Sequence, residues 1–133
     1  MNTLKIAIQK SGRLHDESIQ ILKDCGISVY NGNDQLKVTA SNFPLEVYYL
    51  RNSDIPQYLI DGVVDIAIVG DNLLVEKGQN IQIAEKLGFS KCKVSVAVPK
   101  NFNYNSIQDL KGLRVATSYP KTVIDYFSSK GIL

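Results

Sequence analysis

The segment at residues 63–69, VVDIAIV, restricts the possible folds more than any other part of the chain. It is almost continuously apolar, and a glycine stands on each side of it. Such a run predicts a central β-strand that is covered on both faces, which is typical of parallel sheets. We therefore expect a sheet with helices packed against it.

Segments with strand and helix patterns alternate along the chain, which predicts a mostly parallel α/β sheet. Apolar and polar side chains alternate at residues 4–9, and residues 14–25 carry apolar positions at helical spacing. Gly26 is placed to end that helix. Strands are also expected at residues 27–30, 36–40, 45–50, 81–87, 93–98 and 113–117, a turn at 31–34, and helices at 73–77, 106–110 and 120–130.

A further helix is expected within residues 51–62. Ser53 or Asp54 can cap its start, and Pro56 suits its first turn. Gly62 can close it.

The charge pattern argues against nucleic acid and membrane partners. The 15 basic and 13 acidic residues are mixed along the chain, with a net charge of +2 and no basic block. No apolar run approaches the roughly 20 residues that span a bilayer, and the N-terminus lacks the pattern of a signal peptide. We expect a cytoplasmic protein.

Metal-binding residues are sparse. Cys25 and Cys92 are isolated thiols in apolar contexts, which predicts reduced, packed side chains rather than a disulfide or a metal site. With a single histidine and no cysteine cluster, no zinc site is expected.

Polar residues gather at three strand-to-helix junctions, where ligands bind in open α/β sheets. At the first junction, Gly12 allows close backbone approach, and Lys10 and Arg13 add positive charge beside a helix N-terminus. Phosphate or a carboxylate would suit this loop, although an ordinary turn with solvated basic side chains is about equally compatible with the pattern. The loop is not a P-loop.

The second junction follows the apolar run. Asp65 lies inside the run, and a structural role, in helix capping or in pairing with Arg51, is favoured over ligand binding. Asp71 and Asn72 lie beyond the end of the strand and are placed toward a cleft.

The third junction, residues 116–120, places hydroxyl groups before a helix with proline in its first turn. It suits an anion or a ribose. A helix cap alone explains Thr117 or Ser118 but not Tyr119. His15 is expected at the surface, and no Ser/His/Asp set or close carboxylate pair is present. The residues alone therefore leave open a binding protein or a transferase whose substrates supply the chemistry.

Five segments, taken together and in order, resemble the ATP phosphoribosyltransferase family, and in particular its long form. They are IAIQKSGRL, RNSDIP, DGVVDIAIVGDNLL, LGFSKCKVSVAVP and LKGLRVATSYP. The resemblance implies a periplasmic-binding-protein-like (type II) two-lobed α/β fold. Residues 1–98 would form the first lobe, largely present, and residues 99–133 the start of a truncated second lobe.

The resemblance also implies an activity. Adenine N1 of ATP would attack the anomeric carbon of phosphoribosyl pyrophosphate, and pyrophosphate would leave with Mg²⁺, in the first step of histidine biosynthesis. No residue is assigned as acid, base or nucleophile, because such chemistry needs mainly positioning and charge stabilisation. By motif, the nucleotide and cleft contacts would be Lys10, Ser11, Gly12, Arg13, Arg51, Asp54, Asp71 and Asn72, faced by Ser118, Tyr119 and Pro120.

Other expectations concern the extent of the chain. The phosphate-gripping loop and the regulatory domain of the family have no counterpart here, so we expect a fragment that is inactive alone and part of a homo-oligomer when intact. Two alternatives stay open: a non-catalytic small-molecule sensor domain, and an inert fragment that self-associates through an exposed sheet edge.

Overall fold

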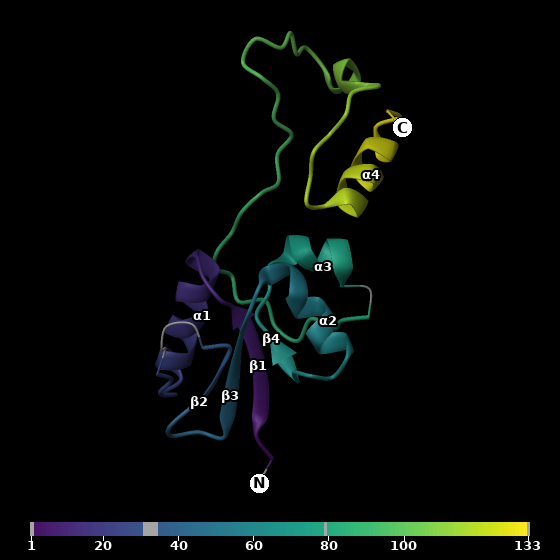
Figure 1. Cartoon of the computed structure of the whole chain (residues 1–133). Helices are drawn as coiled ribbons and strands as arrows, with labels where there is room; N and C mark the ends of the chain where they lie inside the picture. The colour runs from purple at the N-terminus through teal and green to yellow at the C-terminus, as the bar shows by residue number, and fades with distance from the viewer. Residues whose placement is uncertain (1, 31–34, 79, 133) are drawn as a thin grey trace. The chain divides into compact units, whose positions relative to one another are not determined.

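The computed structural model describes residues 2–30, 35–78 and 80–132 (Figure 1). The chain forms two compact units, unit 1 at residues 1–91 and unit 2 at residues 92–133. Each unit is described by itself below.

Unit 1 is built on a four-stranded sheet. Its strands are β1 (Leu4–Gln9), β2 (Lys37–Thr39), β3 (Leu45–Leu50) and β4 (Ile66–Ala67), in the spatial order β2-β3-β1-β4. β1 runs parallel to both β3 and β4, and β2 pairs with β3 in the antiparallel sense. The prediction of a mostly parallel sheet, based on alternating strand and helix patterns, is therefore confirmed for this unit.

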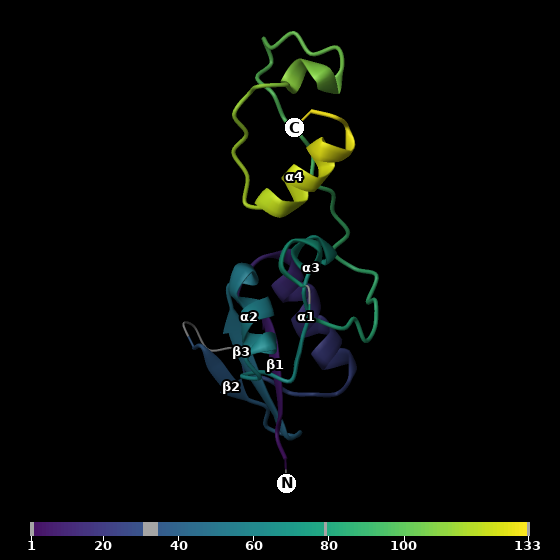
Figure 2. The ribbon, with the colours of Figure 1, turned by 90° about the vertical axis from the view of Figure 1, so that its right-hand side faces the viewer.

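Helices cover both faces of the sheet. The helix α1 (Arg13–Asp24) follows β1, and α2 (Ile55–Ile60) follows β3 through the short 3-10 helix η1 (Asn52–Asp54). Figure 1 shows the sheet between α1 and α2, and Figure 2 shows the same elements after a quarter turn. The short helix α3 (Asp71–Lys77) follows β4.

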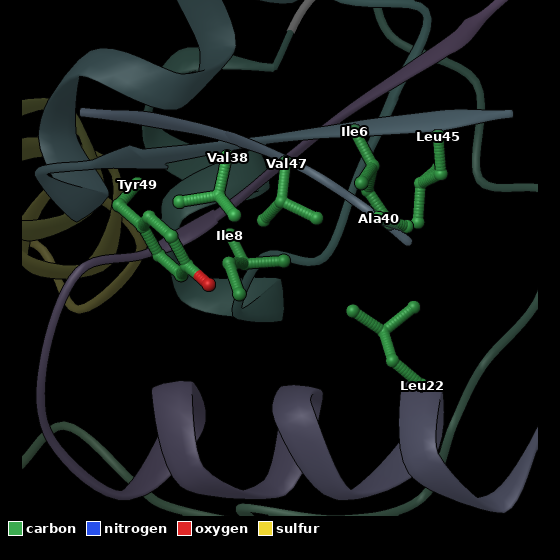
Figure 3. Packing of buried hydrophobic residues seen from close by; sticks show 8 residues of the cluster. All are labelled: Ile6, Ile8, Leu22, Val38, Ala40, Leu45, Val47 and Tyr49. Carbon is green, nitrogen blue, oxygen red and sulfur yellow. The ribbon is translucent and has the colours of Figure 1, made fainter. Parts of the chain in front are cut away.

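Successive residues of β1 pack on opposite faces of the sheet because side chains alternate along a strand. Ile6 and Ile8 belong to a buried cluster that includes Leu22 of α1 (Figure 3). Ala7 belongs to a second cluster that includes Ile55 of α2. The middle of β1 is thus buried on both faces of the sheet, and each face has its own helix.

The strand predicted at residues 63–69 is shorter than expected and is not central. Only Ile66 and Ala67 pair, and they pair with β1 alone, so β4 lies at the edge of the described sheet. Val64 is buried, whereas Val63 and Ile66 are 41% and 44% exposed. The apolar run needs a neighbour on its second side to become a central strand, and no other described strand supplies one.

Four further strand predictions are wrong for the described residues. An alternating pattern gives strand propensity, but a strand forms only where a neighbouring strand takes up its backbone hydrogen bonds. Val94 and Val96, for example, are both 52% exposed and belong to no sheet. The segments without strand structure are residues 27–30, 81–87, 93–98 and 113–117. The predicted turn at 31–34 lies outside the described residues.

The helix ends follow the glycine signals but not the predicted side-chain caps. Gly26 and Gly62 have φ values of 77° and 75°, the left-handed conformation that ends a helix. Pro56 lies in the first turn of α2 as expected. Neither Ser53 nor Asp54 caps that helix with its side chain.

Unit 2 contains two helical segments, η2 (Ile107–Leu110) and α4 (Pro120–Ser129). A capping box starts η2, in which Ser106 and Asp109 each accept a hydrogen bond from the backbone of the other. A small buried cluster joins the two segments through Leu110, Phe127 and Ile132. No helix in the described part of either unit is long and apolar enough to cross a membrane.

Candidate functional site

Three parallel strands of unit 1 end at the same edge of the sheet. Gln9 and Leu50, the last residues of β1 and β3, lie opposite each other, and β4 ends at Ala67 opposite Ala7. The backbone N–H of Lys10 donates to the Leu50 carbonyl at 2.9 Å, which holds the two neighbouring loops together. We call the loops at residues 10–13, 51–54 and 68–72 the carboxyl edge.

Gly12 shapes the first loop of this edge. It is the N-cap residue of α1, with φ 90° and ψ −172°, and no side chain caps the helix. Only glycine adopts this backbone conformation without strain. The amide groups of the first turn, together with exposed Lys10, Ser11 and Arg13, therefore form a basic, donor-rich surface.

Arg13 and the residue one turn later hold a distant segment of the same unit. The Arg13 Nη2 donates to the Lys91 carbonyl at 3.2 Å. The Ser90 hydroxyl donates to the Glu17 carboxylate. Residues 90–91 are thereby fixed beside the start of α1.

His15 is buried, contrary to the expectation of a surface position. It is 8% exposed, its Nδ1 lies 2.9 Å from the Gln9 carbonyl oxygen, and its ring centroid is 5.7 Å from that of Tyr49. The cause is the rotation of α1, whose buried positions are 15, 18 and 22. His15 thus contacts the residue that precedes the loop at residues 10–13, and its role is structural.

The second loop of the edge carries Arg51 and Asp54, both exposed. Arg51 is the N-cap residue of η1, and its carbonyl accepts the Asp54 N–H at 2.9 Å. Between them, the Oδ1 atom of Asn52 is buried and has no hydrogen-bond partner among the residues that the structure describes. A buried acceptor without a donor is unusual in a folded protein. Sequence reasoning did not single out Asn52, because its type alone suggests only a turn.

The third loop places Asp71 and Asn72 in the first turn of α3. Asp71 is exposed, and the Asn72 Oδ1 accepts the Leu73 N–H at 3.0 Å. A Cβ atom on Gly70 would lie 2.7 Å from this Oδ1, so a larger residue at position 70 would force the Asn72 side chain to move. Both predicted residues of this loop thus lie at the carboxyl edge.

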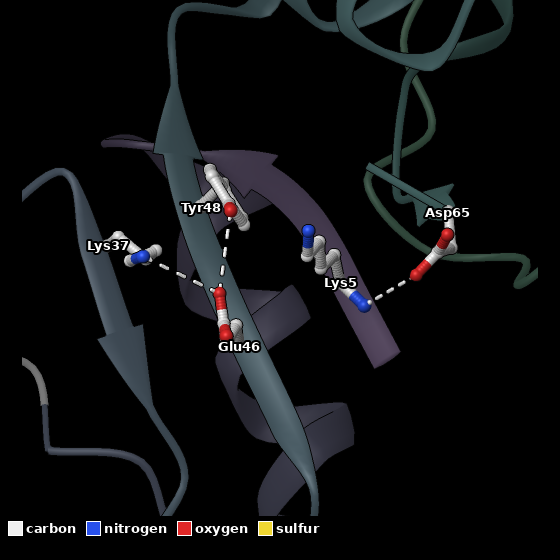
Figure 4. A network of polar contacts seen from close by, with 5 residues as sticks. All are labelled: Lys5, Lys37, Glu46, Tyr48 and Asp65. Carbon is white, nitrogen blue, oxygen red and sulfur yellow. Dashed lines mark hydrogen bonds and ion pairs between the residues drawn. The ribbon is translucent and has the colours of Figure 1, made fainter. Parts of the chain in front are cut away.

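Asp65 has a structural contact at the opposite end of β4. Its Oδ2 accepts the backbone N–H of Lys5 at 2.9 Å, and its own N–H donates to the Lys5 carbonyl at 2.8 Å (Figure 4). These bonds extend the pairing of β1 with β4. The favoured structural interpretation fits this contact, although the partner is a strand and neither a helix nor Arg51.

Ser118, Tyr119 and Pro120 stand at the start of α4 in unit 2. Tyr119 is the N-cap residue and Pro120 the first residue of the helix, and no side chain caps it. The Thr117 Oγ1 instead accepts the Tyr119 N–H at 2.9 Å, which forms a local turn. That these residues face the carboxyl edge stays a prediction.

The remaining polar candidates lie outside any cluster. Among the residues that the structure describes, no group of three His, Cys, Asp or Glu side chains could hold a metal ion. Cys25 and Cys92 are free, but both are exposed, so the predicted packing is wrong. Within unit 1, an open hollow of about 480 Å³ lies near the end of α1, away from the carboxyl edge. Unit 2 has an open hollow of about 600 Å³ of its own.

Electrostatically, the edge combines three basic side chains with two carboxylates. Lys10, Arg13 and Arg51 are exposed, as are Asp54 and Asp71. The arrangement defines a class of protein: an α/β protein with parallel strands, whose polar loops follow the carboxyl ends of those strands. Ligands of such proteins bind at this edge.

Comparison with known proteins assigns this chain to a family. The family profile described as HisG: ATP phosphoribosyltransferase matches residues 51–133, so the chain belongs to the ATP phosphoribosyltransferase family. ATP phosphoribosyltransferases of Cytophaga hutchinsonii and Parabacteroides distasonis are 50% and 43% identical over 129 residues, which is 97% of this chain. Those residues cover 45% and 46% of the two relatives, so the chain spans about half of their length.

A solved structure shows a similar fold. It is titled ATP phosphoribosyl transferase (HisG:HisZ) complex from Thermotoga maritima, and the TM-score is 0.56 at 23% sequence identity. The match covers 97% of this chain and 60% of the Thermotoga chain. The mixed α/β fold is thus shared.

Sequence reasoning missed the residues that support Arg13. A glutamate at position 17 suits the first turns of a helix by its charge, and the sequence pattern marks none of Glu17, Ser90 and Lys91 as part of a site. Ser90 lies 73 positions from its partner Glu17, and Lys91 lies 78 positions from its partner Arg13. Gly88, whose φ is 77°, is a local signal of a change in chain direction before this segment, but nothing in the sequence indicates where the segment docks.

Proposed function

We propose that this chain provides the nucleotide-binding lobe of an ATP phosphoribosyltransferase. The enzyme would join ATP to phosphoribosyl pyrophosphate and release pyrophosphate, in the first step of histidine biosynthesis. The observation that carries the proposal is the exposed basic loop at residues 10–13, which lies beside an uncapped helix N-terminus in a member of this family. Such a loop suits the phosphates of a nucleotide.

The chemistry requires positioning more than proton transfer. In the proposed reaction adenine N1 supplies the electron pair, the anomeric carbon accepts it, and the bond to pyrophosphate breaks. Lys10 and Arg13 would bind and orient phosphate oxygens, and Arg51 would add charge at the next loop. The buried Oδ1 of Asn52 offers an acceptor to an N–H or O–H group of the ligand.

Magnesium would enter with the phosphorylated substrates. Mg²⁺ is usually held by one or two carboxylates together with substrate phosphates and water. Asp54 and Asp71, both exposed at the carboxyl edge, fit this mode, whereas the described residues offer no cage of three protein ligands. When bound, the ion would neutralise charge on the leaving pyrophosphate.

The finer features of the proposal concern the intact protein. We assign it a periplasmic-binding-protein-like (type II) architecture, in which Ser118, Tyr119 and Pro120 face the carboxyl edge from the second lobe. It would be a cytoplasmic homo-oligomer. Support comes from family membership and from the mixed α/β fold shared with the Thermotoga structure.

Nucleotide binding tests the proposal more directly than turnover, because the chain spans 45% of its Cytophaga relative. Calorimetric titration with ATP and Mg²⁺ should show saturable binding. Arg13→Ala should weaken it at least about tenfold, as expected for the loss of a charge-assisted hydrogen bond. Arg114→Ala is the matched control, since Arg114 is an exposed arginine of unit 2 outside the proposed site.

Two results would contradict the proposal. Equal ATP affinity of a folded Arg13→Ala variant would remove Arg13 from the site. Saturable binding of an amino acid, with none of ATP, would instead favour the sensor alternative.

A further inference from the structure

A clasp of four residues joins the start of α1 to the end of unit 1. We use this name for Arg13 and Glu17 on the helix together with Ser90 and Lys91 on the facing segment. Its two bonds run from Arg13 Nη2 to the Lys91 carbonyl, at 3.2 Å, and from the Ser90 hydroxyl to the Glu17 carboxylate. Because positions 13 and 17 are one turn apart, both bonds leave the same face of the helix.

The facing segment has a backbone that requires support. Ser90 has a φ of 51°, and among the residues that the structure describes it is the only non-glycine residue with a positive φ. A non-glycine residue persists in the left-handed region only where the surrounding structure holds it there. The bond from its own hydroxyl to Glu17 is such a restraint.

Arg13 is held through a single donor. Its guanidinium carries five N–H groups, of which one is used by the Lys91 carbonyl. The ion pairs among the described residues are Lys37–Glu46 and Lys121–Asp125. Arg13 therefore forms no ion pair with Glu17. The guanidinium is therefore oriented and yet keeps donors and a full charge for a ligand.

We infer that Glu17 and Ser90 are positioning residues for Arg13. Their bond fixes the segment that presents the Lys91 carbonyl, and that carbonyl holds the guanidinium of Arg13 in one orientation. The inference rests on the proposed function, since it names what orients the arginine that would bind the nucleotide. A side chain held in place before binding loses less conformational entropy when the ligand arrives.

The variants separate the hydroxyl, the carboxylate and the fold. Ser90→Ala and Glu17→Ala each remove one partner of the bond, whereas Glu17→Gln keeps an oxygen that accepts from Ser90. Ser90→Gly removes the hydroxyl and also relieves the left-handed backbone. Ser41→Ala is the matched control, because Ser41 is an exposed serine of unit 1 that follows β2 and lies outside the clasp.

Two measurements on the 133-residue chain test the inference. Without nucleotide, NMR of the ¹⁵N-labelled guanidinium should show slow rotation of the Arg13 group in the unmodified chain, in Glu17→Gln and in Ser41→Ala. Rotation should be fast in Ser90→Ala, Ser90→Gly and Glu17→Ala. The same three variants should bind ATP roughly three- to tenfold more weakly, which corresponds to the loss of one hydrogen bond.

The outcomes distinguish the inference from the function on which it rests. Unchanged rotation in Ser90→Ala would overturn the inference, and so would a freed guanidinium with unchanged ATP affinity in a chain whose Arg13→Ala variant loses ATP. If Arg13→Ala itself binds ATP normally while Ser90→Ala frees the guanidinium, then the proposed function fails and the clasp stands as the support of Arg13.

Discussion

Replacing Tyr49 with phenylalanine should stabilise unit 1. Tyr49 is 5% exposed and belongs to the cluster between the sheet and α1. Its hydroxyl oxygen is buried and has no hydrogen-bond partner within the described part of the chain. Leaving a buried polar group unsatisfied costs about 1–3 kcal/mol. Tyr49→Phe removes that cost and leaves a gap of a single oxygen, which costs about a few tenths of a kcal/mol.

The expected net gain is about 1 kcal/mol in the free energy of unfolding. For a domain of about 100 residues this raises the melting temperature by roughly 4–8 °C. In urea, the transition midpoint should rise by about 0.3–1 M at an unchanged slope. Circular dichroism measures the midpoint and the slope in a urea titration, and the melting temperature in a thermal scan.

The same substitution should change the response to alkaline pH. Burial raises the pKa of the Tyr49 phenol above its ordinary value. The folded state therefore holds this proton more tightly than the unfolded state. Below pH about 10 the phenol is protonated in both states, and the free energy of unfolding falls as the pH rises further. Tyr49→Phe should remove this part of the alkaline loss.

Tyr30→Phe serves as the control: Tyr30 is 81% exposed, so this substitution should leave the free energy of unfolding unchanged. If Tyr49→Phe destabilised the chain by about 1 kcal/mol or more, the hydroxyl would have to be hydrogen-bonded, and the reasoning from its burial would be refuted.

Two further substitutions test local packing and charge. Gly78→Ala should lower the free energy of unfolding by about 1–3 kcal/mol, because the added Cβ atom would lie 2.6 Å from the Leu74 carbonyl oxygen. Thermal unfolding measures this loss, and an unchanged melting temperature would contradict the prediction. The pKa of Asp109 is lowered by the backbone N–H groups of Asn105 and Ser106, so its stabilisation of η2 is present above its ordinary pKa and is lost as the pH falls through the lowered value. The protection factors of those two amides, their exchange rates relative to the unfolded chain at the same pH, should therefore fall in acid. Asp109→Asn should abolish this pH dependence of protection. Equal protection at all pH values would show that the carboxylate does not hold the turn.

The sequence predicts the parts of the fold that local signals specify. β3 is found at residues 45–50 as expected, and α1 begins one residue before its predicted start. Gly26 and Gly62 end their helices because the left-handed conformation is a local property of glycine. These elements could be located without knowledge of their neighbours.

Strands that depend on partners could not be predicted in the same way. Residues 93–98 have the same alternation as residues 4–9, but only the latter lie between two other strands. The difference is tertiary and is absent from the local pattern. The prediction that His15 lies at the surface was wrong for a related reason. The rotation of α1 about its axis, rather than residue type, decides which of its side chains are buried.

The site is predictable in outline and not in its support. The rule that ligands bind beyond the carboxyl ends of parallel strands selects the loops at residues 10–13, 51–54 and 68–72, and the register brings all three to one edge. What orients Arg13 is a carbonyl 78 positions away, and the buried Oδ1 of Asn52 depends on packing. Neither feature has a signature in the sequence.

The central place of β1 has a consequence for the order of folding during synthesis. β1 is made first, yet its neighbours come much later, since Leu4 pairs with Leu45 and Ile6 with Ile66. At about 5–20 residues per second, β3 is translated seconds after β1, and β4 later still. The central strand of the sheet is therefore synthesised before either of its neighbours, and the sheet can form only when more than half of unit 1 has been made.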